Sequence, residues 1–213
     1  MVELATLPGE LVLAVADSDE GLLAGTGPEG RVYRMGEGEP AVVLERPEAS
    51  AWALEESARD GWLAGFGPDA ALVRFDPDET GEGEVLSTYE ASVVRKLLRD
   101  DDHLWLATQG PSLIFQSTDD ADVPDRLRYD GGANEIPAMV SDGSGGLWFV
   151  VLNPGDPDQF EVPSSQLLHL PVDGSAEIVW EGELAIMSLA RAADGALLLG
   201  EIGASPVSYT HLT

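Results

Sequence analysis

The chain of 213 residues contains no cysteine. Disulfide bonds are therefore excluded, and so are metal sites built on thiolate ligands. The absence of cysteine does not fix the compartment. Stability has to come from packing, hydrogen bonds and charge interactions.

Basic residues are scarce. The chain has 11 Lys and Arg against 39 Asp and Glu, a net charge of −28, and Lys96 is its one lysine. An acidic surface of this kind repels nucleic acid and anionic membranes, so neither is expected as a partner. It could attract cations or basic proteins. The alternative is plain solvation, for example in a salty habitat where self-repulsion is screened.

Long apolar runs are also missing, so no membrane span is expected. The first residues show no basic, apolar leader of the signal-peptide type, although a fragment could have lost one. Hydrophobic residues still make up 44% of the chain, which is ample for a shared core.

The chain does contain an internal repeat. Similar segments open at positions 40 to 49 residues apart, at Gly21, Gly61, His103, Gly146 and Gly195. This period is typical of the blades of a β-propeller, because short β-units that cannot bury a face alone must stack on one another. The predicted fold class is therefore all-β, a β-propeller of four-stranded antiparallel blades with about five repeats, four complete and one partial.

Each repeat contains four short apolar runs separated by Gly, Pro and Asp, the pattern of an antiparallel meander. The first runs are predicted over residues 11–16, 51–54, 93–97, 136–140 and 185–189. The second runs begin at the five openers. Gly-Pro pairs follow the second run at residues 27–28, 67–68 and 110–111. They predict type I turns with proline at the second position and, in the first repeat, glycine at the fourth.

The predicted domain organisation is one propeller over residues 1–205. Its repeats span residues 10–47, 48–89, 90–134, 135–182 and 183–205. Residues 2–5 match a fourth strand, which either closes the last blade or remains from a preceding blade in a fragment. Residues 206–213 resemble an adaptor-derived, non-native tail, although 207–212 also fall where a third strand belongs.

One set of polar residues recurs with the repeat. A glutamate precedes the first strand of every repeat, 11 to 13 residues before the opener: Glu10, Glu48, Glu90, Glu135 and Glu183. First strands of propeller blades are innermost, so these carboxylates, with Asn134 beside one of them, could form a ring that binds a cation such as calcium or a basic ligand group. The alternative is that each glutamate makes the same local hydrogen bond to its neighbouring blade, or simply solvates a connector. No catalytic residue and no other cofactor is predicted.

Residues 48–54 (EASAWAL), 61–68 (GWLAGFGP) and 72–75 (LVRF) resemble bacterial propeller repeats of the WD-like and two-component-regulator types. The resemblance covers residues 2 to about 203. It lacks the WD dipeptide and the kelch double glycine. Such proteins are often exported, so the resemblance implies a periplasmic or extracellular location.

Two function hypotheses follow. The resemblance implies a non-catalytic platform that binds a protein or a small ligand on the face with the glutamates and the Gly-Pro turns. The alternative is a metal-dependent propeller enzyme, similar to lactonases or to streptogramin lyases, whose strand signature resembles residues 145–149 (GGLWF). Catalysis requires unlike residues at equivalent positions, whereas this chain repeats like residues, which favours the platform.

Overall fold

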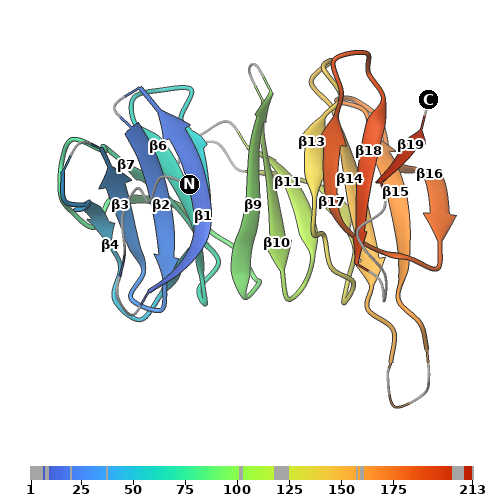
Figure 1. Ribbon diagram of the computed structural model, residues 1–213, viewed down its shortest axis with the longest axis horizontal. Coiled ribbons are helices and arrows are strands. Elements are labelled where there is room, and N and C mark those ends of the chain that lie inside the picture. The colour runs from blue at the N-terminus through green and yellow to red at the C-terminus, as the bar shows by residue number, and fades with distance from the viewer. Residues whose placement is uncertain are drawn as a thin grey trace. The chain divides into compact units, whose positions relative to one another are not determined.

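The computed structural model describes residues 7, 10–19, 21–36, 38–100, 103–117, 125–156, 158 and 161–202, and the backbone of 209–212. The chain forms two compact units. The first comprises Met1–Leu97 and Ser117–Pro124, and the second comprises Leu98–Gln116 and Asp125–Thr213. Each unit is built from antiparallel sheets (Figure 1).

The strands follow one another in the repeating order that the sequence predicts. The first sheet contains β1 (Leu11–Ser18), β2 (Gly21–Gly27), β3 (Arg31–Met35) and β4 (Ala41–Glu45). The second contains β5 (Ser50–Glu56), β6 (Trp62–Gly67), β7 (Ala71–Phe75) and β8 (Glu84–Thr88). The third contains β9 (Val93–Asp100), β10 (His103–Gln109), β11 (Leu113–Ser117) and β12 (Arg126–Asp130).

The fourth sheet contains β13 (Met139–Ser141), β14 (Leu147–Asn153), β15 (Ser164–Leu170) and β16 (Glu177–Gly182). The fifth contains β17 (Ala185–Arg191), β18 (Leu197–Ile202) and β19 (Tyr209–Leu212). Four complete four-stranded sheets and one partial sheet therefore confirm the predicted fold class. Among the described residues no helix is long and apolar enough to cross a membrane.

One predicted strand is shorter than expected. The apolar run over 136–140 predicts a full strand, but β13 covers only Met139–Ser141. Pro137 has no N–H to donate to a ladder, so pairing is interrupted there. Before the proline, contact with the sheet continues as an isolated bridge between Glu135 and Leu152.

The first strand of three repeats contains the same irregularity. The pairing of β1 with β2 shifts between Val12 and Ala14, that of β5 with β6 shifts between Ala51 and Ala53, and that of β17 with β18 shifts between Ile186 and Ser188. In each case one residue stands out of register, as in a β-bulge. The displaced residues are Leu13, Trp52 and Met187.

Successive repeats pack closely where the second strand carries glycine. A Cβ at Gly25 would lie 2.9 Å from the Ala51 carbonyl oxygen, and a Cβ at Gly65 would lie 2.5 Å from Val94 Cγ1. Glycine therefore lets the first strand of the next repeat approach the second strand. This close approach explains why β2 and β6 each carry an Ala-Gly pair in the middle of a buried strand.

Each unit has its own buried apolar cores. In the first unit Leu23, Leu44 and Phe66 belong to one cluster. In the second unit one cluster includes Trp105 and Phe149, and another includes Leu167, Ile186 and Leu199. Two tryptophans belong to these clusters: Trp62 is 9% exposed and Trp105 is fully buried.

Two predictions about the ends of the chain fall largely outside the described residues. The outer strand predicted at residues 2–5 lies wholly outside them, as does most of the segment 206–213. Within that segment, the backbone of β19 pairs with β18, from Leu197 opposite Leu212 to Gly200 opposite Tyr209.

Candidate functional site

Glu10, the first of the five predicted glutamates, is held within its own repeat. Its carboxylate accepts hydrogen bonds from the Thr26 hydroxyl, from Arg31 Nη1 at 2.9 Å and from the Tyr33 hydroxyl at 2.9 Å. The side chain is only 4% exposed. Burial by itself raises the pKa of Glu10, but these hydrogen bonds and the Arg31 charge lower it below its usual value. The three partners of Glu10 belong to its own repeat, whereas the alternative predicted from the sequence was a hydrogen bond to a neighbouring blade.

The other glutamates have different surroundings. Glu90 is exposed in the connector before β9, and the backbone of Glu135 exchanges both hydrogen bonds with Leu152, at 2.8 Å each. The five positions are divided between the two units. A ring of carboxylates therefore stays a prediction, and so does a calcium ion bound by it. Within the described residues no three His, Asp or Glu side chains are grouped as metal ligands.

In the second unit two of the predicted residues do come together. Asn134 and Glu183 line one pocket of about 450 Å³. The rest of its lining is mainly polar and includes Asn153, Ser164 and Gln166. The pocket lies where β14 and β16 end and the connector to β17 begins.

In the first unit Glu48 lies between two adjoining pockets that share the Gly67-Pro68 turn. We call them the Arg46 pocket and the Trp52 pocket, and together the turn-edge site. The Arg46 pocket has a volume of about 380 Å³. The Trp52 pocket has a volume of about 350 Å³. The site thus combines two features that the sequence predicts on one face, a connector glutamate and a Gly-Pro turn.

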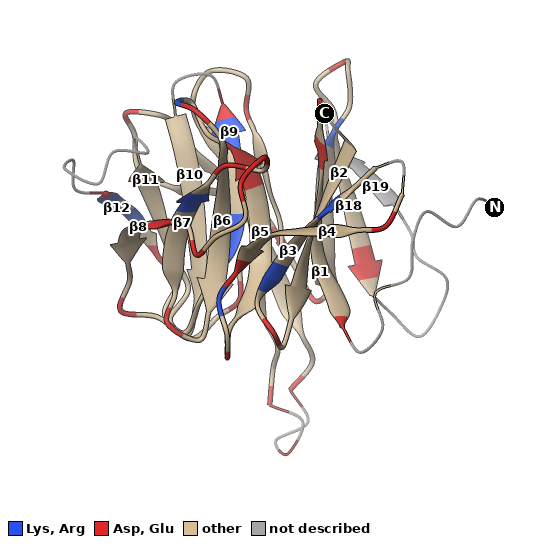
Figure 2. Cartoon of the chain, turned by 90° about the vertical axis from the view of Figure 1, so that its left-hand side faces the viewer, with Lys and Arg blue, Asp and Glu red and all other residues tan. Residues whose placement is uncertain are grey.

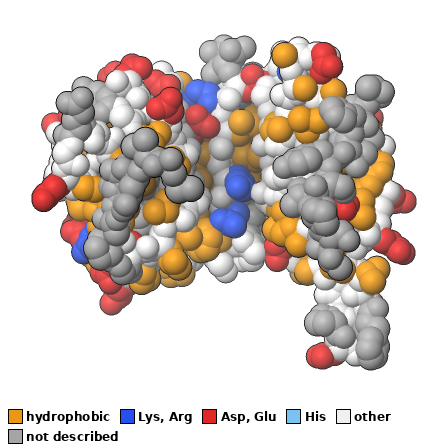
Figure 3. Space-filling view, viewed as in Figure 1, with side chains coloured by type: hydrophobic (Ala, Val, Ile, Leu, Met, Phe, Trp, Pro, Cys, Tyr) orange, Lys and Arg blue, Asp and Glu red, His pale blue; other side chains and the backbone are white. Residues whose placement is uncertain are grey.

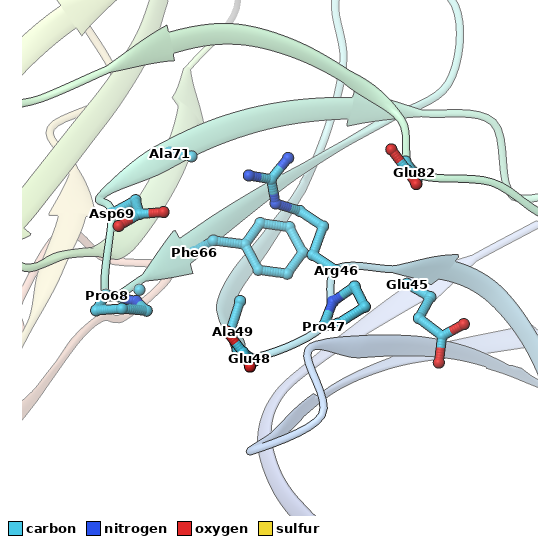
Figure 4. A pocket seen from close by; sticks show the side chains of 11 residues that line it. Glu45, Arg46, Pro47, Glu48, Ala49, Phe66, Pro68, Asp69, Ala71 and Glu82 are labelled. Atoms are coloured by element: carbon cyan, nitrogen blue, oxygen red, sulfur yellow. The ribbon is translucent and has the colours of Figure 1, made fainter.

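The Arg46 pocket is built around a cation on an aromatic ring. The Arg46 side chain extends over Phe66, with its guanidinium carbon 5.4 Å from the ring centroid (Figure 4). Buried Nε of Arg46 has no hydrogen-bond partner among the described residues. Carboxylates surround this cation: Asp69 and Glu82 lie to either side of it in Figure 4, and Glu48 lies below.

The connector that carries Arg46 is fixed by its backbone. The Arg46 N–H donates to the Gly30 carbonyl at 3.0 Å, and the Ala49 N–H donates to the Arg46 carbonyl at 3.3 Å. Glu48 closes this turn with a φ of 64°, in the left-handed region. The facing turn contains one of three cis Gly-Pro bonds, at Gly67-Pro68. Arg46 is therefore presented by an ordered turn.

The Trp52 pocket is more apolar. Its lining includes Trp52, Val93 and the two turn prolines Pro28 and Pro68. The guanidinium carbon of Arg95 lies over the face of Trp52, 4.5 Å from the ring centroid. This arrangement is attractive for a cation and an indole ring. Arg95 and Lys96 are neighbours on β9, and basic side chains are visible over this strand in Figure 3. Acidic residues, in contrast, occur mainly in turns and connectors along the chain (Figure 2).

Sequence reasoning missed the pairing of Arg46 with Phe66. Phe66 stands where the first repeat has Thr26, so the second repeat cannot bind its connector glutamate as the first does. Arg46 is also one of few basic residues in the chain, and it lies two residues from a predicted site residue. Phe66 in place of a threonine, and an arginine two residues before Glu48, were the sequence features that could have indicated this pair.

The second unit contains one histidine–carboxylate pair. His169 Nε2 lies 2.8 Å from Asp142 Oδ2, and the His169 ring stacks on Trp148 at 4.2 Å. The same carboxylate accepts the Ser144 N–H at 2.7 Å and the Gly146 N–H at 3.0 Å. Burial raises the pKa of Asp142, but the hydrogen bonds outweigh burial and lower it. This set of bonds closes the turn between β13 and β14, which is a structural role.

Comparison with known proteins gives the fold and no family. No family model and no curated protein matches the chain. A structure described as the nidogen/laminin complex matches with a TM-score of 0.62 and 16% identity, over 84% of this chain and 68% of that one. A protein of unknown function from Bacteroides caccae matches with a TM-score of 0.58 and 12% identity, over 91% and 71%.

The N-terminal domain of Nup159 matches with a TM-score of 0.51 and 14% identity, over 94% of this chain and 56% of that domain. At these identities the likeness concerns the fold alone. Together with the sheet order, it defines the class of protein: a β-propeller of four-stranded antiparallel blades, four complete and one partial.

Proposed function

We propose that this protein is a non-catalytic binding platform whose turn-edge site takes a protein segment or a small ligand. The observation that carries the proposal is the pairing of two pockets around Glu48, one with an arginine stacked on Phe66 and one lined by Trp52. Tryptophan and arginine are among the side chains that contribute most to binding energy at interfaces, and Trp52 and Arg46 are both partly exposed.

The arrangement of titratable side chains also fits binding better than catalysis. A general base must lie within hydrogen-bond reach of the group from which it takes a proton, and a third group usually orients it. Asp142 and His169 meet part of this description, but their carboxylate is already engaged by two backbone amides of its own turn. For the turn-edge site, a fixed backbone and mixed polar and apolar lining favour recognition.

The fold likeness is compatible with this proposal and does not identify a ligand. One matched structure is described as a nidogen/laminin complex, in which a propeller-like chain and a protein partner are named together. We include in this proposal that the chain is exported, as the sequence resemblance implies.

A random library of 12-residue peptides displayed on phage tests the platform. Peptides enriched on the wild-type protein are expected to bind Trp52→Ala at least about tenfold more weakly, because a central aromatic anchor typically contributes more than 1 kcal/mol. Val162→Ser is the control, since Val162 is 59% exposed and lies outside the turn-edge site. Enriched peptides that bind all three proteins equally would contradict the proposal.

A further inference from the structure

The Arg46 pocket combines an incompletely satisfied cation with carboxylates that do not pair with it. We propose that this pocket binds a small zwitterion of the free amino acid class, with the ligand carboxylate on the Arg46 guanidinium and the ligand ammonium group toward the carboxylates that line the pocket. This inference rests on the proposed function and specifies the ligand chemistry of the same site.

The first step concerns the guanidinium. Arginine carries five N–H donors in a planar fork that matches a carboxylate. Within the described residues Arg46 makes no ion pair, and its buried Nε has no acceptor. A buried donor without a partner is costly, and stacking on Phe66 occupies only the face of the cation. Because the Nε atom is buried, a ligand carboxylate would bind the terminal Nη groups, for which the described residues provide no hydrogen-bond acceptor.

The second step concerns the nearby acids. Glu45 is engaged, because its Oε1 accepts from Arg31 Nε at 2.8 Å. Among the described contacts, the carboxylates of Glu48, Asp69 and Glu82 have no such bond, although all three line the pocket. One guanidinium and three carboxylates form a lining with excess negative charge, which repels a ligand that is only anionic.

The third step excludes a ligand that is only cationic. A lone ammonium group would be attracted by Asp69 and Glu82 but would meet the charge of Arg46 and leave its donors unpaired. A zwitterion satisfies both sets of groups at once. The pocket volume of about 380 Å³ suits such a small molecule and lies at the small end of ligand pockets.

The test is a titration of ¹⁵N-labelled protein followed by NMR at low ionic strength, in which the Arg46 Nε–H resonance reports on the guanidinium. The probes are glycine and γ-aminobutyrate, which carry both charges at two separations, and acetate and methylammonium, which carry one charge each. We expect at least one zwitterion to shift this resonance and to bind at least about tenfold more tightly than either single-charge probe, as expected for charge-assisted hydrogen bonds.

Two variants examine the two halves of the pocket. Arg46→Lys keeps the charge but removes the planar fork, and is expected to weaken zwitterion binding at least about tenfold. Glu82→Gln is expected to reduce the preference for a zwitterion over acetate. Arg126→Ala is the control, because Arg126 is exposed on β12 and outside the pocket; it is expected to leave binding unchanged.

Three results would overturn the inference: acetate or methylammonium binding as tightly as the zwitterions, binding unaffected by Arg46→Lys, or no binding of any probe. Each of these leaves the peptide-selection result with Trp52→Ala untouched. A failure of the ligand chemistry can therefore be told from a failure of the platform.

Discussion

At the scale of single residues, Asp142 has a contribution to stability that depends on pH. Its carboxylate accepts hydrogen bonds from His169 and from two turn amides, and it is 8% exposed. Because its pKa is lowered on folding, its contribution is fully present above the pKa of the unfolded chain. The contribution is lost as the pH falls through the folded pKa.

We therefore predict that Asp142→Asn lowers the free energy of unfolding by about 1–3 kcal/mol at pH 6, the range for hydrogen bonds to a charged group. The difference from wild type should shrink as the pH falls from about 5 to about 2. Urea unfolding at several pH values measures it. Asp17→Asn, on the exposed side of β1, is the control. A difference that does not depend on pH would show that the charge of Asp142 is irrelevant to the turn.

Single residues also show where repetition predicts structure and where it does not. Gly30 ends a turn with a φ of 61°, and the same position in the next repeat is Ala70 with a φ of 44°. The Gly-Pro pattern predicts the turn in both repeats. It does not predict that an alanine accepts the left-handed conformation, because that depends on the neighbouring connector rather than on local preference.

At the scale of elements, Arg128 joins β12 to the turn between β15 and β16. Its Nη1 donates to the Gln116 side chain at 2.8 Å and to the Val172 carbonyl at 2.7 Å. Its Nη2 donates to the carbonyls of Pro171 and Gly174, each at 2.9 Å. The guanidinium also lies 5.2 Å from the ring of buried Trp105. Desolvation lowers the pKa of Arg128, and the four acceptors offset this loss of hydration.

Arg128→Lys should therefore destabilise the protein by about 2–3 kcal/mol, because an ammonium group cannot reach four acceptors in one plane and several carbonyls lose their donors. Urea unfolding measures the change. Arg126→Lys, two residues away on the same strand, is exposed and should change stability by less than about 0.5 kcal/mol. If both substitutions had the same effect, the guanidinium geometry would not matter to the junction.

Elements differ in how far the sequence predicts them. Strands bounded by Gly, Pro and Asp were predicted to within a few residues, since such boundaries are local signals. β13 is shorter than predicted because Pro137 interrupts the pairing. The prediction followed the apolar residues of the run and gave this proline no weight. The Arg128 junction was not predicted, because it joins side chains to carbonyls 43 to 46 residues away and has no repeat signature.

At the scale of the whole molecule, the sequence predicts the fold class but only part of the candidate site. Equivalent glycines and glutamates report what the repeats share, such as the close approach at Gly25 and Gly65. A binding site depends on what one repeat does differently. Arg46 lies at the end of the first repeat and Phe66 in the second, and their contact arises from folding across the connector between the two repeats.

The charge of the whole chain yields the last prediction. In the part of the chain that the structure describes, few ion pairs, among them Arg34–Asp78 and Arg74–Glu84, oppose the net charge of −28. Exposed pairs contribute little, so self-repulsion should dominate the response to salt. Raising NaCl from 0.02 to 0.5 M shortens the screening length from about 20 Å to about 4 Å. We expect the melting temperature to rise by about 2–4 °C, which corresponds to about 1 kcal/mol for a chain of this size. KCl should give the same rise.

CaCl₂ at equal ionic strength separates screening from binding, because an ion that binds only the folded state adds its own stabilisation. A larger rise with calcium that is lost in Glu183→Gln would support the predicted carboxylate ring, and equal rises in all three salts would leave screening as the whole effect. A fall in melting temperature with NaCl would contradict the prediction, since it would mean that the ion pairs outweigh the repulsion.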